Sequence, residues 1–390
     1  MKICSDEKCT ACGACGFSCP KNAIVMQENQ VGVVYPVVNE SLCIQCGRCR
    51  KICPQINLPE FYNPKKVYAA WSADQEERRT SASGGIAAEI YKSALEQQVS
   101  ICGAKLNSDF SVSFELGDNV KDIEKFKNSK YVFSTMYEIY PQLRKLLKAG
   151  GQAVVIGLPC QIAAIRNLFP NEEKLLLVDL VCHGTTSFSY LKQHISWLET
   201  KFNDHAVKMS FRDPYKHTYT YTFTLYNKMG EQFYAQRTKD GDTYQFGYHR
   251  MISYRENCYN CSFAKEKRIS DITLSDYKGL GKLSPCDFGE QKVSNVMIHT
   301  NKGEIWISDL IKQGHIIAEE RPIREPILGD AQLQHPSEKS RARLDFQKYI
   351  QYYNGDFEKT MRSVLRKEAK RELSQKILSF ARKIKNKISR

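Results

Sequence analysis

The sequence predicts an α+β and α/β protein in three parts: a small cysteine-rich unit, a mixed-sheet α/β body and a C-terminal amphipathic helix. Three observations predict this arrangement. Cysteines repeat near the N-terminus, apolar runs alternate with helical stretches after residue 67, and cations crowd the last 35 residues. We place the cysteine-rich unit at residues 1–59, two halves of the body at 67–204 and 205–345, and the tail at 356–390. A length of 390 residues is sufficient for two or three domains.

The N-terminal cysteines form two copies of the pattern C-x2-C-x2-C-x3-C-P, and the second copy lies 34 residues after the first. In bacterial dicluster ferredoxins, three thiolates of one copy and the fourth thiolate of the other copy hold each 4Fe-4S cluster. Two Cys4 zinc sites are the alternative, but zinc does not need the third cysteine or the Cys-Pro that ends each copy. The spacing therefore predicts a dicluster ferredoxin domain, with cluster I on Cys9, Cys12, Cys15 and Cys53, and cluster II on Cys43, Cys46, Cys49 and Cys19.

The composition places the protein in the cytoplasm. No apolar run is long enough for a membrane span, and the first residues lack the apolar core of a secretory signal. Cluster ligands must be free thiolates, which a disulfide-forming compartment would not favour. The net charge is +14, and residues 356–390 contribute +8 of it through twelve Lys or Arg and four Asp or Glu. The basic charge is therefore mostly a property of the tail.

The body should begin at Val67, after a linker around residues 61–64. Strand-like runs alternate with helical stretches, which argues for an α/β domain with a parallel or mixed sheet. Consecutive antiparallel strands follow, and then a strand, a helix and a strand. The expected strands are Ala23–Met26 and Val31–Val38 in the first unit, and Val67–Trp71, Ala153–Ile156, Leu175–Val181, Val207–Arg212, Tyr219–Tyr226, Gln232–Gln236, Val293–His299 and His315–Ala318 in the body. The expected helices are Gly85–Gln97, Met136–Lys148, Gln161–Leu168, Phe188–Lys201 and Glu304–Lys312.

Four further cysteines occupy positions that suggest chemistry. Cys160 and Cys182 each follow an expected strand, while Cys258 and Cys261 form a C-x2-C pair. Sites in α/β sheets collect at the carboxyl ends of strands. We therefore expect these four thiolates, the second cysteine set, to hold a third 4Fe-4S cluster, with zinc as the alternative. The remaining Cys4, Cys102 and Cys286 have no partner spacing and are expected to be non-ligands.

Several stretches together resemble one protein family. They are Ser81-Ala82-Ser83-Gly84-Gly85, Gly157-Leu158-Pro159-Cys160-Gln161, Asp179-Leu180-Val181-Cys182-His183-Gly184, Phe211-Arg212-Asp213, and Cys258 to Ala264 followed by Arg268 to Thr273. Residues 67–345 resemble the family of coenzyme F420 hydrogenase and formate dehydrogenase β subunits, which includes 7-hydroxymethyl chlorophyll a reductase. The resemblance implies an FAD protein that passes electrons between the flavin and an adjacent iron–sulfur cluster. This chain departs from the family pattern at Leu158, at Pro214-Tyr215-Lys216-His217 and at Ser275-Asp276-Tyr277-Lys278.

Candidate flavin contacts follow from the resemblance. Ser81, Ser83, Gly84 and Gly85 precede an expected helix whose free amides suit a pyrophosphate; an ordinary helix cap is the alternative. Lys267 and Arg268, with Lys265, are candidates to neutralise phosphate or reduced flavin, or are solvated cations. Asp276 is a candidate partner for a flavin or ribose hydroxyl. His183 is a weak candidate proton donor, and a hydrogen-bonded turn residue is the favoured interpretation of it. No Rossmann glycine motif is present in the sequence.

These features predict an iron–sulfur, flavin-dependent oxidoreductase. Electrons would pass from a ferredoxin or another redox protein through the clusters to FAD, and then to a small reducible substrate. Relatives with this layout resemble proteins of bacterial surface-polysaccharide gene clusters, so that metabolism is one expected setting. The alternatives are a non-catalytic electron-transfer subunit that docks on a separate catalytic protein, and a true coenzyme F420 oxidoreductase subunit.

The tail carries apolar residues mostly four positions apart, from Met361 to Ile388, among many cations. A basic amphipathic helix of this kind can lie on an anionic membrane surface. The alternative is a helix that packs on its own domain or on another subunit. Contact with the inner face of a membrane is therefore one candidate interaction of this chain, beside that alternative. No nucleic-acid partner is expected, because the tail lacks interleaved aromatic residues and a recognised reading module.

Overall fold

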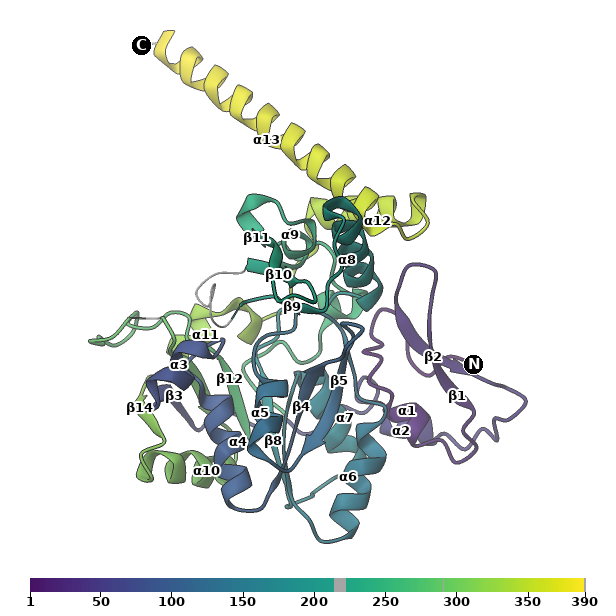
Figure 1. The fold of residues 1–390 in the computed structure, drawn as a ribbon, viewed down its shortest axis with the longest axis vertical. Helices are drawn as coiled ribbons and strands as arrows, with labels where there is room; N and C mark the ends of the chain where they lie inside the picture. Colours follow the sequence, from purple (N-terminus) through teal and green to yellow (C-terminus); the bar gives the residue numbers. More distant parts are fainter. Residues whose placement is uncertain (214–221, 290, 389–390) are drawn as a thin grey trace.

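The computed structural model describes residues 1–213, 222–289 and 291–388. Its centre is a nine-stranded mixed sheet in the order β14-β3-β13-β12-β8-β7-β4-β5-β6 (Figure 1). The strands are β3 (Lys66–Ser72), β4 (Ser100–Leu106), β5 (Val112–Gly117), β6 (Ser134–Thr135), β7 (Ala153–Gly157), β8 (Leu175–Leu180), β12 (Ile272–Asp276), β13 (Ser294–Ile298) and β14 (Ile316–Glu320). The mixed-sheet α/β class predicted from the sequence is confirmed.

The central strands are buried on both faces, which explains their continuous apolar runs. On β7 and β8, Ala153, Val155, Leu175 and Leu177 face one helical layer, while alternate residues face the other. The first layer contains α6 (Ile139–Lys148) and α7 (Pro159–Leu168), and the second contains α4 (Ile86–Glu96), α5 (Val120–Phe126) and α10 (Asn301–Lys312). Two short helices, α3 (Gln75–Thr80) and α11 (Arg324–Gly329), lie near the β3 end of the sheet (Figure 1).

Strands from before and after residue 204 join this one sheet. β3 to β8 come from the first half of the body, while β12, β13 and β14 come from the second. The boundary that we placed near residue 204 stays a prediction about domains, and it does not divide the sheet.

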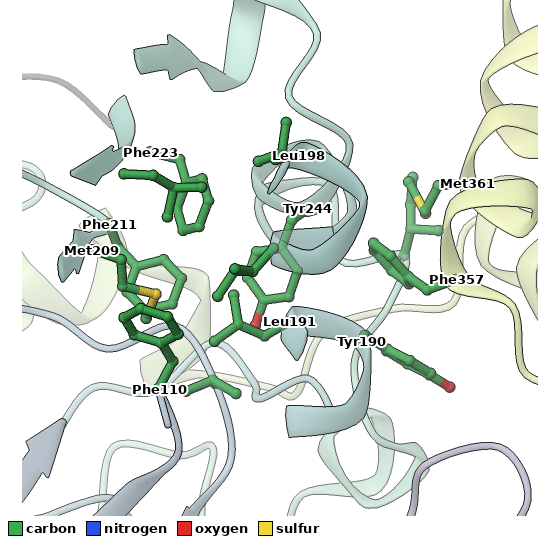
Figure 2. Packing of buried hydrophobic residues seen from close by; sticks show 14 of the residues in the cluster. Phe110, Tyr190, Leu191, Leu198, Met209, Phe211, Phe223, Tyr244, Phe357 and Met361 are labelled. Atoms are coloured by element: carbon green, nitrogen blue, oxygen red, sulfur yellow. The ribbon is translucent and has the colours of Figure 1, made fainter. Parts of the chain in front are cut away.

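A second, three-stranded sheet lies beside the large sheet, in the order β11-β10-β9. Its strands are β9 (Lys208–Ser210), β10 (Thr222–Tyr226) and β11 (Gln232–Arg237). The described part of the expected strand Tyr219–Tyr226 is β10; its first residues, and Pro214 to His217, lie outside the described residues. The sheet packs with α8 (Phe188–Phe202), α9 (Thr243–His249), α12 (Arg341–Tyr352) and the start of α13 (Phe357–Ile388) around an aromatic core. Figure 2 shows this core, in which the rings of Phe211, Phe223 and Tyr244 pack near one another.

The N-terminal unit contains α1 (Ala14–Phe17), β1 (Ile24–Glu28), β2 (Val34–Val38) and α2 (Arg48–Ile52). β1 and β2 form an antiparallel pair. α1 and α2 pack on α6 and α7 of the body. Ala14 is fully buried in the same core as those helices. The linker around residues 61–64 is also bound to the body, because Tyr62 and Arg268 exchange two backbone hydrogen bonds.

The helix α13 begins in the aromatic core and ends far from it. Phe357, Met361 and Val364 are buried. Beyond them the helix extends away from the body (Figure 1). Within the described residues, no helix combines the length and apolarity that crossing a membrane requires.

Candidate functional site

The predicted site residues lie along one edge of the large sheet. β7, β8 and β12 are mutually parallel, and β3 points the same way because β13 is antiparallel to both β12 and β3. The carboxyl ends of these four strands therefore share an edge. Cys160 follows β7, Cys182 follows β8, Asp276 ends β12, and the segment from Ser81 to Gly85 follows β3 through α3.

The second cysteine set surrounds one cavity. Cys160, Cys182, Cys258 and Cys261 all line it, although they come from three separate segments. Zinc would need sulfur atoms about 2.3 Å from a single point. Within the described residues, no three Cys, His, Asp or Glu side chains could hold a single metal ion. The structure thus brings the four predicted ligands around one shared space.

The thiols of the second cysteine set are buried and influence one another's charge. Burial, followed by the neighbouring cysteines, raises the pKa of Cys160, Cys182 and Cys261. Thiolates crowded in such a place need a compensating positive charge, which bound iron would supply. The Thr185 amide donates to Cys258 Sγ at 3.4 Å, which is the kind of contact that orients a ligand sulfur.

The N-terminal cysteines are grouped across the repeat. Cys53, from the second copy, interacts electrostatically with Cys9, Cys12 and Cys15 of the first copy. Conversely, Cys19 from the first copy lies with Cys43, Cys46 and Cys49 around another cavity. This is the crossed grouping that the dicluster pattern predicts.

Cluster I faces the second cysteine set. Cys12 lines the same cavity as the four cysteines of that set. Three body side chains hold the loop before it: Arg255 Nη1 donates to the Thr10 carbonyl at 3.1 Å, Tyr137 Oη to Ala11 at 3.2 Å, and Tyr140 Oη to Cys12 at 2.7 Å. These contacts hold the first copy of the cysteine repeat, which we call the inner copy, against the cavity. Sequence reasoning missed all three residues, which lie more than 120 positions from the loop.

Cys4, expected to be a non-ligand, lies beside two predicted cluster I ligands. Its thiol hydrogen-bonds with Cys9 and Cys53 and lowers their pKa values to about 7 and about 6. No spacing rule in the sequence pointed to this contact. By contrast, Cys102 is fully buried, as expected of a small packing residue.

The predicted phosphate loop is built on tight backbone packing. A Cβ at Gly84 would lie 2.5 Å from the Ala70 carbonyl, and Gly85 caps α4 with a φ of 88°. Neither position accepts a larger residue without strain. The side chains already have protein partners: Ser81 Oγ donates to Glu77, and Ser83 Oγ donates to the Val293 carbonyl.

A group of cations, which sequence reasoning missed, lies beside this loop. Lys292 donates to the Ser81 carbonyl, and Arg78 Nε donates to the Lys292 carbonyl at 2.9 Å. Burial, followed by nearby Arg212, lowers the pKa of Lys292 to about 8. Arg212 also lies 3.8 Å from the carboxylate of Asp276. No local motif could have indicated this group, because its members come from three separate segments.

The other predicted cofactor contacts lie in different settings. Arg268 is buried, and two of its nitrogens donate to Asp179 Oδ2 at 3.1 and 2.8 Å. It also lines the cysteine cavity. Lys267 is exposed, while the Lys265 ammonium lies 4.4 Å from the Phe61 ring centre. The structure thus commits Arg268 to an internal ion pair beside the cysteines.

His183 lies at the cavity mouth with two charged neighbours. Its Nε2 is 2.9 Å from Lys278 Nζ and 3.5 Å from Asp330 Oδ1. The side chain is partly exposed and lines the cysteine cavity. The residue is held by polar contacts, because Ser337 Oγ also donates to its carbonyl at 2.8 Å.

Comparisons with known proteins match both regions. Residues 8–56 match the 4Fe-4S dicluster domain, and residues 151–323 match the C terminus of the coenzyme F420 hydrogenase/dehydrogenase beta subunit. One subunit of the F(420)H(2) dehydrogenase of Methanosarcina mazei is 25% identical over 276 residues, which are 67% of this chain and 73% of that protein.

Two further likenesses are more limited. The coenzyme F420-dependent sulfite reductase of Methanocaldococcus jannaschii is 31% identical over 179 residues, which are 43% of this chain but 26% of that protein. A chain of the xenon-derivatised F420-reducing [NiFe] hydrogenase complex of Methanosarcina barkeri has a TM-score of 0.44 and 20% identity, and the match covers 77% of this chain and 91% of that one.

The crossed cysteine groups and the dicluster match define an iron–sulfur redox protein. Residues 151–323 of the body match the coenzyme F420 hydrogenase/dehydrogenase beta subunit family, and an N-terminal 4Fe-4S dicluster domain precedes them. The chain is therefore related to electron-transferring oxidoreductase subunits.

Proposed function

We propose that this protein is an iron–sulfur flavoprotein oxidoreductase. Electrons enter from a ferredoxin-type donor, pass through clusters II and I to a third 4Fe-4S cluster at the second cysteine set, and reach FAD and then a small reducible substrate. The observation that carries the proposal is the shared cavity of Cys12 and the second cysteine set, because it would bring two clusters together at the domain junction.

The flavin position is supported by the order of strands along the sheet edge. β3, which leads to the phosphate loop, lies three strands from β8, or about 14 Å at ~4.8 Å per strand. The N-terminus of α4 and the nearby cations Arg78, Arg212 and Lys292 suit a pyrophosphate. When bound there, FAD accepts electrons singly and passes on two as a hydride. His183, the candidate proton donor, would hand over a proton from its partly exposed position beside the cysteine cavity.

The first experiment is metal and flavin analysis of anaerobically purified protein. We expect about twelve iron per chain, no stoichiometric zinc, and FAD. Cys258→Ser should lower the iron content by about four, whereas Cys286→Ser, away from both cysteine groups, should not change it. About eight iron with zinc in the wild type would overturn the third cluster.

Flavin binding has its own matched pair of variants. Lys292→Gln removes a buried cation beside the phosphate loop and should release most of the flavin at unchanged iron content. Lys282→Gln removes an exposed cation, and this variant should retain the flavin. Equal flavin content in both variants would place the pyrophosphate elsewhere.

Two alternatives have observations in their favour. The matched relatives include proteins named for coenzyme F420, which favours a true F420 oxidoreductase subunit. Exposed Leu42 and Ile44 beside Cys46 favour a non-catalytic subunit that docks on another protein. Reduction of purified coenzyme F420 by the isolated chain would select the first, and cluster reduction without any substrate turnover would select the second. Surface-polysaccharide metabolism stays our proposal for the setting if F420 is not reduced.

We also propose that the distal part of α13 contacts an anionic membrane surface. From Leu373 onward the sequence has six cations and no acidic residue, and the helix extends away from the body (Figure 1). The protein should co-sediment with vesicles containing phosphatidylserine but not with pure phosphatidylcholine. Lys383, Lys385 and Lys387→Glu should abolish this. Unchanged sedimentation of that variant would overturn the contact.

A further inference from the structure

The second copy of the cysteine repeat, around Cys43, Cys46 and Cys49, is the outer copy. Unlike the inner copy, it is open to solvent. Cys46 is exposed, and most of residues 41–51 around it are exposed as well. An added Cβ at Gly47 would meet no atom within 4 Å. In the inner copy, the corresponding Cβ at Gly13 would lie 2.2 Å from the Tyr137 ring. Within the described chain, the side of this copy that carries Cys46 and Gly47 is therefore open.

The rim of this opening is cationic and apolar. The cavity that holds Cys19, Cys43, Cys46 and Cys49 is lined by Lys21, Arg48 and Arg50, and no Asp or Glu is among its lining residues. Ile44, which also lines it, is 57% exposed, and neighbouring Leu42 is 51% exposed. Lys51 adds another exposed cation on α2. We call the surface formed by Lys21, Leu42, Ile44, Cys46, Arg48, Arg50 and Lys51 the Cys46 face.

From this geometry we infer that the Cys46 face is the docking surface for a one-electron carrier protein with an acidic surface. Exposed apolar side chains inside a cationic rim match a partner whose redox centre is surrounded by carboxylates, because opposite charges steer and orient the encounter. Single-electron transfer requires close approach to cluster II, and this face is the opening through which cluster II is reached. In this transfer the carrier is oxidised by one electron, and cluster II is reduced by the same electron. The inference rests on the proposed direction of electron flow.

The electrostatic prediction is specific to this face. Arg48→Glu with Lys51→Glu reverses two exposed cations that are not cluster ligands. Lys145→Glu with Lys148→Glu makes the same change of net charge on α6, where both lysines are exposed. The control pair therefore separates local docking from overall charge.

The experiment mixes each anaerobic protein with a reduced, acidic bacterial 2[4Fe-4S] ferredoxin in a stopped-flow instrument and records cluster reduction. At low salt, R48E/K51E should slow the second-order rate by at least ~10-fold and remove its decrease with added salt, while K145E/K148E leaves the rate within about twofold. Methyl viologen radical, a small reductant, should reduce both proteins equally, and their iron contents should match.

Equal ferredoxin rates for the two double variants would overturn the docking surface. Concentration-dependent dimerisation that R48E/K51E abolishes, without any change in the ferredoxin rate, would assign the face to a second copy of the chain instead. These outcomes are independent of the proposed flavin chemistry, because cluster reduction is recorded directly. Failure of the flavin proposal would appear as missing FAD with normal cluster reduction.

Discussion

The two copies of the cysteine repeat have the same spacing but opposite surroundings. In the inner copy, the residues around Gly13 lie against Tyr137 and Tyr140 and next to the second cysteine set. In the outer copy, Gly47 meets nothing and Cys46 is exposed. The difference does not come from the repeat itself, since both glycines have nearly the same φ, 79° and 73°. It comes from body residues that cover one copy alone, and this asymmetry distinguishes a buried copy from an exposed one.

Arg255 is the residue whose loss should break this asymmetry most strongly. Its guanidinium is buried, donates to the carbonyls of Thr10 and Val34 at 3.1 and 3.0 Å, and lies 4.4 Å from the Phe133 ring centre. Arg255→Met leaves both carbonyls unpaired, so we expect a loss of about 3–5 kcal/mol in the free energy of unfolding. Arg48→Met on the exposed copy should change it by less than ~0.5 kcal/mol.

Anaerobic urea unfolding, followed by cluster absorbance, measures both variants. The comparison fails if Arg48→Met costs as much as Arg255→Met. A normal urea midpoint for Arg255→Met would show that α1 and α2 hold the cysteine-rich unit to the body without its help.

Substitution of His194 is a change confined to the body, and it should affect neither copy of the cysteine repeat. It is fully buried, with Nδ1 2.6 Å from Glu358 and Nε2 3.0 Å from Asp242. Burial disfavours its charged form, but the two carboxylates outweigh this and raise its pKa to about 9. Since the unfolded value is ~6.5, the stabilisation, at most about 3 kcal/mol, is complete below pH ~6.5 and is lost as pH rises through about 9.

The measurement is the unfolding midpoint of the body between pH 6.5 and 9.5, followed by tyrosine fluorescence. Wild type should lose stability across this range. His194→Gln should be less stable at pH 6.5 and have a flatter pH profile, with unchanged iron content. A wild-type profile that is flat or rises with pH would show that the imidazole is neutral in the folded protein.

Gly13 and Gly47 sharpen the comparison at equivalent positions. Alanine at either site places a Cβ on a left-handed residue, which costs about 1–2 kcal/mol. Only Gly13→Ala also forces a Cβ into the Tyr137 ring, which adds ~1–3 kcal/mol. The difference between the two urea midpoints isolates the contact with the body. Tyr137→Leu in the Gly13→Ala background should reduce that difference, and no reduction would assign it to another neighbour.

Much of the site could be predicted from the sequence, because its chemistry follows local rules. The spacing of the eight cysteines predicted their crossed grouping, and the placement of Cys160 and Cys182 after strands predicted that they would meet. Parallel strands end on one edge, so this second inference needed only the strand positions. The strands β7 and β8 were readable because both faces are buried and their residues are continuously apolar.

What could not be predicted depends on contacts between distant segments. Nothing near Cys4 indicates that its thiol touches Cys9 and Cys53. Arg268 follows a cysteine pair, and the sequence suggested a cation available to a cofactor. Its guanidinium instead donates to Asp179, which lies 89 residues earlier. Strands β4 to β6 mix polar and apolar residues because they lie towards one end of the sheet, so no periodicity marked them. Which copy of the repeat faces the body was likewise decided by Arg255, Tyr137 and Tyr140.

Tyr140 provides the smallest and most local test of the comparison. Its ring packs in the core beside α1, with 5.6 Å between its centre and that of Phe17, and its hydroxyl donates to the Cys12 carbonyl at 2.7 Å. Tyr140→Phe keeps the ring and leaves one buried carbonyl unpaired, so we expect a loss of about 1–2 kcal/mol. Because Cys12 is the predicted cluster I ligand that lines the cavity of the second cysteine set, the EPR signal of cluster I should change while that of cluster II stays as in wild type. Tyr35→Phe, on the half-buried strand β2, is the matched control and should change neither signal. If the altered signal belongs to the cluster held by Cys43, Cys46, Cys49 and Cys19, the assignment of inner and outer copies is reversed.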